Sequence, residues 1–167
     1  TSNLHYYLEQ HPNIHMSRPK ELNFFSQDER FKKGIDWYKT FFKSNKSILG
    51  ESSQQYTRFP KFPNCAERIY NTLGDNIKFI YLVRDPIDRI ISHYVENHTK
   101  NDINGELNNL LINNDVDDYI HTSNYFSQIE QYLHYYDLNK FLIIDSNELK
   151  SNRLNTLNKV FDFLNID

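Results

Sequence analysis

The sequence predicts an α/β fold with a central parallel sheet flanked by helices. Short apolar stretches of strand length alternate along the chain with amphipathic helix patterns, which is typical of this class. The strongest stretch, residues 77–83, is β-branched, aromatic and nearly continuous, as expected of a parallel strand covered on both faces. The 167 residues suffice for one domain with a hydrophobic core and are too few for two.

The remaining elements follow from periodicity and from their boundary residues. Helices are expected over residues 1–11, 33–42, 65–73, 123–136 and 154–164. Pro12 ends the first of them, and Gly74 ends the third. Strands are expected over residues 47–50, 77–83 and 141–144, loops over 19–25 and 59–63, and a polar helical hairpin or loop over 101–118.

A further helix is expected directly after the strongest strand. Asp85 is a good N-cap, and Pro86 fits the first helical position. The apolar residues of this helix share one stripe, which we expect to face the core: Ile87, Ile90, Ile91, Tyr94 and Val95.

Charge and composition narrow the functional classes. The net charge is −3 and the sequence pI about 6.1, without a basic stripe, so we do not expect a nucleic-acid binder. A single cysteine, Cys65, excludes an intramolecular disulfide and favours a reducing compartment, so a cytoplasmic location is expected. No stretch reaches the roughly 20 apolar residues of a membrane span, and none is expected in this segment.

The most informative residues lie where the strongest strand ends. Open α/β sheets bind ligands beyond the carboxyl ends of their strands, and Arg84 puts a fork-shaped cation there. Ser92 lies two turns into the following helix, so that its hydroxyl could donate to the same phosphate. Alternatively, Arg84 pairs with Asp85 or Asp88, and Ser92 belongs to an ordinary helix surface.

Two further groups suit chemistry with an anionic ligand. Glu21 lies between Lys20 and an apolar Leu/Phe segment; apolar neighbours make a carboxylate a stronger base, whereas the lysine opposes this. Judged alone, most such glutamates are surface residues. Thr1 and Ser2 open a helix, whose free N–H groups form a natural anion site, although a simple N-cap explains them equally well.

Residues 19–42 and 77–94 together resemble the family of sulfotransferases that use 3′-phosphoadenosine 5′-phosphosulfate (PAPS). The branch with heparan-sulfate and related bacterial sulfotransferases is the most similar, and the likeness extends over nearly the whole chain. The resemblance implies a P-loop NTPase-like sulfotransferase fold. It also places the first strand and the phosphate loop before Thr1, so residues 1–167 are expected to be a sulfotransferase domain truncated at both ends.

The resemblance also implies roles for the matching positions. Arg84 and Ser92 match the residues that bind the 3′-phosphate of PAPS, and Glu21 matches the catalytic base of the heparan-sulfate branch. Thr1 and Ser2 match the end of the phosphosulfate loop. The implied reaction transfers a sulfuryl group from PAPS, the co-substrate, to a hydroxyl or amine, with a saccharide among the candidate acceptors. No metal is expected, because the histidines are scattered.

The sequence departs from the family pattern at two positions. Ser52 follows Glu51 where many relatives carry a lysine, and Asn23 stands where family members often have histidine. Two alternatives therefore stay open: a kinase-like phosphotransferase on the related fold, with Asp145 as a metal ligand, and a non-catalytic nucleotide-binding domain.

Overall fold

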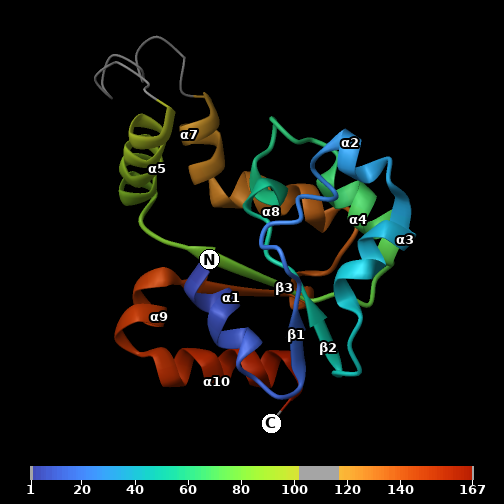
Figure 1. Cartoon of the computed structure of the whole chain (residues 1–167). Coiled ribbons are helices and arrows are strands. Elements are labelled where there is room, and N and C mark those ends of the chain that lie inside the picture. The colour runs from blue at the N-terminus through green and yellow to red at the C-terminus, as the bar shows by residue number, and fades with distance from the viewer. Residues whose placement is uncertain (1, 102–116, 167) are drawn as a thin grey trace.

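Four short strands pair two by two at the centre of the structure (Figure 1). The computed structural model describes residues 2–101 and 117–166. Strand β1 (Ile14–Met16) pairs in parallel with β2 (Ile48–Gly50), and β3 (Phe79–Val83) pairs in parallel with β4 (Phe141–Asp145). The predicted parallel pairing is therefore confirmed, and the described strands form two separate two-stranded sheets.

Helices surround both pairs of strands. The α-helices are α1 (Ser2–Glu9), α2 (Asp28–Phe31), α3 (Gly34–Lys39), α4 (Cys65–Leu73), α5 (Pro86–Asn101), α7 (Asp117–Ser123), α8 (Tyr125–Leu133), α9 (Ser146–Ser151) and α10 (Arg153–Leu164). The 3₁₀ helices are η1 (Thr40–Phe42), η2 (Gln54–Thr57) and η3 (Leu138–Lys140). Helices α9 and α10 lie on one side of the β3–β4 pair, and α8 lies on the other (Figure 1).

The alternation of side chains along β3 and β4 feeds two hydrophobic cores. Ile80 and Leu82 face the core that includes the apolar residues of α1 and α10. Phe79 stacks on Phe141 with ring centroids 4.8 Å apart and faces the second core, where Tyr132 of α8 meets both rings. One pair of strands thereby separates two helical layers, as a period of two residues requires.

Helix α5 starts at Pro86, as the sequence predicts. The Asp85 carboxylate accepts the backbone N–H groups of Ile87 at 2.9 Å and Asp88 at 3.1 Å. This cap satisfies two of the amides that a helix start leaves without partners. It fixes the direction in which α5 leaves the strand end at Arg84.

The apolar stripe of α5 is not buried, which corrects one prediction. Ile87, Ile91 and Val95 are 67%, 45% and 53% exposed. The helix instead turns its polar residues inward: His93 packs edge-on against Tyr119 of α7 with centroids 4.5 Å apart, and Asn97 donates to the Tyr119 hydroxyl at 2.8 Å. Because a polar contact with α7 orients the helix, the apolar periodicity alone pointed to the wrong face.

Most other predicted elements are confirmed within a few residues. The helices expected over residues 65–73 and 154–164 match α4 and α10, although Leu154 is 72% exposed and does not join the core. Sequence reasoning missed β1, α2 and α9, each of which is only three to six residues long. Strand β3 is partly buried at every position rather than fully covered. Residues 102–116 of the predicted polar insert lie outside the described residues.

Candidate active site

Two segments that follow β1 and β2, residues 20–25 and residues 51–56, are joined by hydrogen bonds. In the first, residues 20–25, the backbone N–H of Asn23 donates to Ser53 Oγ at 2.9 Å, and that of Phe25 donates to the Tyr56 hydroxyl at 3.3 Å. Leu22, Phe24 and Phe25 are each about 1% exposed. The first segment is therefore anchored by its apolar side chains and fastened to residues 51–56 by hydrogen bonds.

Glu21 lies within this fastened segment. Its Oε1 accepts Lys20 Nζ at 3.0 Å, and its Oε2 accepts the backbone N–H of Gln54 at 3.4 Å. The Glu21 and Lys20 side chains are 15% and 20% exposed. A partly buried carboxylate held by a cation and an amide has a fixed position, which suits a proton acceptor.

Glu51 is a second carboxylate at the same place, and sequence reasoning did not single it out. Both of its carboxylate oxygens are shielded from solvent and lack a hydrogen bond of good geometry among the described residues. Burial raises the pKa of Glu51 to about 7, nearby hydroxyls of Tyr56, Tyr38 and Ser53 offset part of this rise, and the charge of Glu21 adds to it. Its position directly after a strand was the available signal.

Arg84 follows β3 and reaches over the start of α5. Its Nη2 donates to the backbone carbonyl of Asp88, and its backbone N–H donates to the Tyr125 hydroxyl at 3.3 Å. The Asp85 carboxylate caps the helix instead. Nε of Arg84 is shielded from solvent and has no hydrogen-bond partner in the described part of the chain, which leaves a donor for a ligand.

Ser92 lies one helical turn beyond Asp88 and is exposed. In an α-helix, the carbonyl of residue 88 accepts the amide of residue 92. The Arg84 guanidinium therefore contacts the carbonyl that closes the turn leading to Ser92. Arg84 lies before the start of α5, and its guanidinium contacts the carbonyl one turn before Ser92.

Two further arginines, Arg58 and Arg89, which sequence reasoning missed, are affected by the charges of Glu21 and Arg84. Arg58 Nε donates to Asp118 Oδ1 at 3.1 Å, and Arg89 Nη1 donates to Ser123 Oγ at 3.1 Å. Burial lowers the pKa of both guanidinium groups; the charge of Glu21 acts on Arg58, and the charges of Arg58 and Arg84 act on Arg89. Arg89 could have been found, because it lies three residues before Ser92 on the same helix.

Burial also governs the imidazole next to these cations. The pKa of His93 is lowered to about 4, first by burial and then by the charges of Arg89 and Arg58. Its Nδ1 is shielded and has no hydrogen-bond partner among the residues that the structure describes. His93 is therefore neutral at physiological pH and adds no positive charge to the row of arginines.

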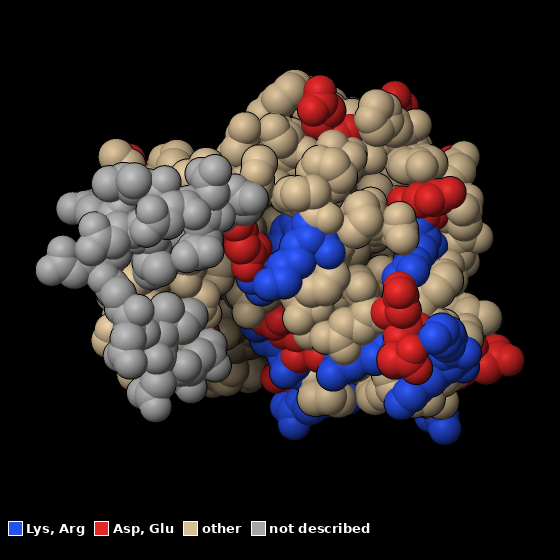
Figure 2. All heavy atoms as spheres, turned by 90° about the horizontal axis from the view of Figure 1, so that it is seen from above, with Lys and Arg blue, Asp and Glu red and all other residues tan. Residues whose placement is uncertain are grey.

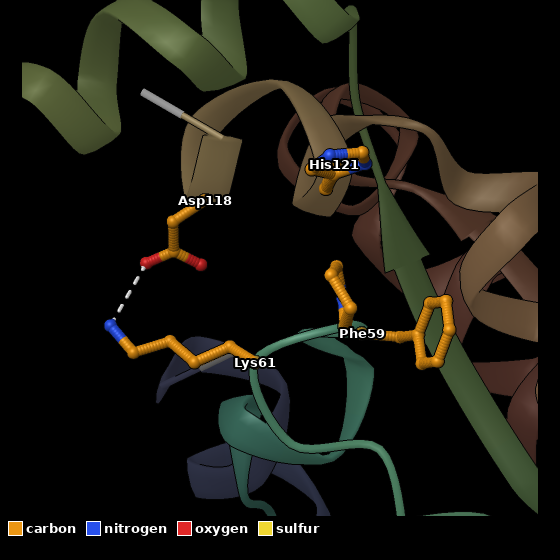
Figure 3. Close-up of a pocket in the computed structure, with 5 residues that line it drawn as sticks. Phe59, Lys61, Asp118 and His121 are labelled. Carbon is orange, nitrogen blue, oxygen red and sulfur yellow. Dashed lines mark hydrogen bonds and ion pairs between the residues drawn. The ribbon is translucent and has the colours of Figure 1, made fainter. Parts of the chain in front are cut away.

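Two hollows lie near these groups. The first, about 260 Å³, is lined by Phe59, Pro60, Lys61, Asp118 and His121, and Lys61 reaches the Asp118 carboxylate across it at 3.5 Å (Figure 3). The second, about 320 Å³, is lined by Ser2, Asn3, Tyr7, Leu82, Ser146, Leu149, Lys150 and Arg153.

The predicted site residues are therefore only partly brought together. Ser2 is exposed at the start of α1 and lines the second hollow, and Thr1 lies outside the described residues. Neither hollow is lined by Glu21, Arg84 or Ser92. Glu21 is linked to Arg84 through the charges of Arg58 and Arg89 rather than by a direct contact. The roles expected for these residues remain predictions.

Within the described residues, His, Cys, Asp and Glu are the side chains that could bind a metal ion. No group of three or more His, Cys, Asp or Glu side chains in residues 2–101 and 117–166 is arranged to hold a metal ion. Asp145, the metal ligand of the kinase alternative, caps α9 by accepting the N–H of Asn147 at 2.8 Å.

Within residues 2–101 and 117–166, no helix has the length and apolar character to cross a membrane. Basic and acidic side chains lie next to one another on the face seen from above (Figure 2).

Comparison with known proteins identifies the family. Residues 1–167 match the family model described as "Sulfotransferase domain". The chain belongs to the sulfotransferase family.

Curated relatives agree with this assignment. The chain is 31% identical over 171 residues to heparan sulfate glucosamine 3-O-sulfotransferase 5 of Mus musculus, covering 95% of this chain and 48% of the relative. It is 28% identical over 187 residues to bifunctional heparan sulfate N-deacetylase/N-sulfotransferase 2 of Homo sapiens, covering 99% of this chain and 21% of that protein. The chain therefore spans half or less of the length of these relatives.

A solved structure confirms the predicted fold. The chain superposes on a sulfotransferase from Alicyclobacillus acidocaldarius with a TM-score of 0.83, at 22% identity, over 99% of this chain and 76% of the other. At this identity the likeness establishes the fold alone.

The buried carboxyl of Glu51 predicts a pH-dependent stability. Its pKa rises from an ordinary 4.5 to about 7 on folding, so the native state binds more protons than the unfolded state between these values. The free energy of unfolding should therefore fall as pH rises from about 5 to 7, by on the order of 3 kcal/mol. Glu51→Gln removes this titration. In urea unfolding, the variant should match the wild type at pH 5 and exceed it at pH 8.

Glu29→Gln is the matched control, because the Glu29 side chain is 84% exposed on α2. It should change stability little at either pH. An effect of Glu51→Gln that is the same at pH 5 and pH 8 would show that Glu51 does not titrate in this window.

Proposed function

We propose that the protein transfers a sulfuryl group from PAPS to a hydroxyl or amine acceptor. One observation supports the proposal: Arg84, at the end of β3, donates to the carbonyl one turn before Ser92 and keeps a shielded Nε without a partner among the described residues. A guanidinium and a hydroxyl suit a phosphate dianion, and a strand end of an α/β sheet is the usual place for it. These residues fit the 3′-phosphate of PAPS.

The residues of this chain divide the work of an in-line transfer. Arg84 and Ser92 hold the 3′-phosphate, and Arg58 and Arg89 add positive potential along the path to Glu21. Glu21 accepts the acceptor's proton as the acceptor oxygen or nitrogen attacks sulfur. The bond from sulfur to the bridging oxygen breaks, and adenosine 3′,5′-bisphosphate leaves. PAPS supplies the activated sulfuryl group, and Ser2 at the start of α1 lies where an anion is stabilised.

A saccharide is the acceptor class that we propose. The relatives named above are, by their names, heparan sulfate sulfotransferases: one is a glucosamine 3-O-sulfotransferase and the other an N-deacetylase/N-sulfotransferase. An acidic sugar chain could pair with the cations Arg58, Lys61 and Arg89.

A cytoplasmic location is also proposed, on the single, buried Cys65, and fractionation of cells that produce the protein would check it.

The two alternatives make different demands. A phosphotransferase needs a metal ligand at a strand end, and the helix-capping role of Asp145 argues against it. A non-catalytic nucleotide-binding domain would bind the bisphosphate without turnover, so a sulfation assay separates it from an enzyme.

Calorimetry tests the phosphate site. Replacing Arg84 by glutamine should weaken adenosine 3′,5′-bisphosphate binding by roughly 30-fold, because a hydrogen bond to a charged group is worth about 2 kcal/mol. Ser92→Ala should cost about fivefold. Neither change should alter the affinity for adenosine 5′-monophosphate, which lacks the 3′-phosphate. Equal losses for both nucleotides would remove the assigned role.

Turnover tests the base. Glu21→Gln keeps the shape of the side chain and removes its proton-accepting charge, so kcat for sulfation should fall by about 10²- to 10⁴-fold. The affinity for adenosine 3′,5′-bisphosphate should stay the same. Glu29→Gln is the control with an exposed carboxylate and should retain kcat. Near-normal turnover of the Glu21 variant would exclude it as the base.

A further inference from the structure

Lys20 is the cation that stands nearest to the predicted base. Its Nζ donates to Glu21 Oε1 at 3.0 Å, and its side chain is only 20% exposed. An ordinary surface lysine keeps its ammonium in water, so a largely covered ammonium next to a carboxylate needs an explanation. Sequence reasoning treated Lys20 as a neighbour that weakens Glu21.

The surroundings of Lys20 tie it to Ser52 and to the start of α1. His5, one turn into α1, shares a contact of 3.0 Å between its Nδ1 and Ser52 Oγ. Burial, followed by the charge of Lys20, lowers the pKa of His5, so the ammonium lies close to that imidazole. Lys20, His5 and Ser52 therefore share one corner, between the first turn of α1 and the strand ends that carry Glu21 and Glu51.

Among the described residues, Lys20 is paired with one carboxyl of this corner, Glu21. The charge of Glu21 acts on the second carboxyl of the corner, Glu51. The charge of Arg18, two residues before Lys20, also acts on His5, but the Arg18 side chain is 79% exposed and pairs with Glu9 at 2.6 Å. Negative charge that develops beside Glu21 during transfer would meet Lys20 first.

We propose that Lys20 is a catalytic residue that contacts the sulfuryl group during transfer, in the corner formed with His5 and Ser52. This inference rests on the proposed function. In the step, the acceptor oxygen or nitrogen forms a bond to sulfur and passes its proton to Glu21. The sulfur–oxygen bond to the bisphosphate breaks, and the electron pair stays on the leaving oxygen. Lys20 donates to the oxygens around sulfur and offsets their negative charge.

Lys20→Met tests the contact, with Arg18→Met as the matched control. Sulfation is followed in the full-length protein with PAPS and a desulfated heparan sulfate oligosaccharide. Lys20→Met should lower kcat about 10²-fold, the usual cost of one preorganised donor. It should weaken PAPS more than adenosine 3′,5′-bisphosphate in calorimetry, because the bisphosphate lacks the sulfuryl group. Arg18→Met should change neither.

Introducing a lysine at Ser52 makes the test more specific. Because Ser52 faces the same corner, Lys20→Met combined with Ser52→Lys should regain at least tenfold of the lost kcat. The proposal is overturned by a Lys20→Met kcat within threefold of the wild type, or by a double variant without recovery. A wild type that binds the bisphosphate but sulfates nothing would instead refute the proposed function.

Discussion

The burial of Leu22, Phe24 and Phe25 is the constraint on which the candidate active site depends. Each side chain is about 1% exposed, and together they hold an irregular loop against the aromatic core around Tyr38 and Tyr132. Loops that carry catalytic groups usually lie on the surface, where they move. Here the apolar anchors, with the hydrogen bonds from Asn23 and Phe25 to residues 53 and 56, give the Glu21 carboxylate a fixed position.

Electrostatics then shape what this loop can do. The charge of Glu21 acts on Arg58, and the charges of Arg58 and Arg84 act on Arg89, so these groups share one electrostatic field. Asp118 neutralises part of Arg58, whereas Arg89 meets the hydroxyl of Ser123. The buried Glu51 remains protonated below about pH 7, so the corner beside Glu21 holds one negative charge instead of two.

Much of the fold could be read from the sequence, because local signals agree with it. The cap at Asp85, the stop at Gly74 and the apolar run before Arg84 each determine an element boundary by themselves. Strand β1 could not be found, because three residues carry no periodicity. The prediction of which face of α5 is buried was wrong, because the helix is oriented by contacts of His93 and Asn97 with Tyr119, which lies more than 20 residues away in the chain.

The residues of the candidate active site could likewise be predicted only in part. Arg84, Ser92 and Glu21 stand out by their place next to a strand or within a recognisable segment, whereas Arg58, Glu51 and Lys20 acquire their meaning from neighbours distant in sequence. Burial and charge coupling are properties of the folded chain, so residue type alone does not reveal them.

The most direct test of the central claim is a crystal structure of the full-length protein with adenosine 3′,5′-bisphosphate. We expect the 3′-phosphate to accept hydrogen bonds from Arg84 Nε and Ser92 Oγ, and the 5′-phosphate to be directed toward Lys20 and Glu21. A nucleotide bound elsewhere, with Arg84 contacting only the Asp88 carbonyl and Ser92 facing solvent, would contradict it.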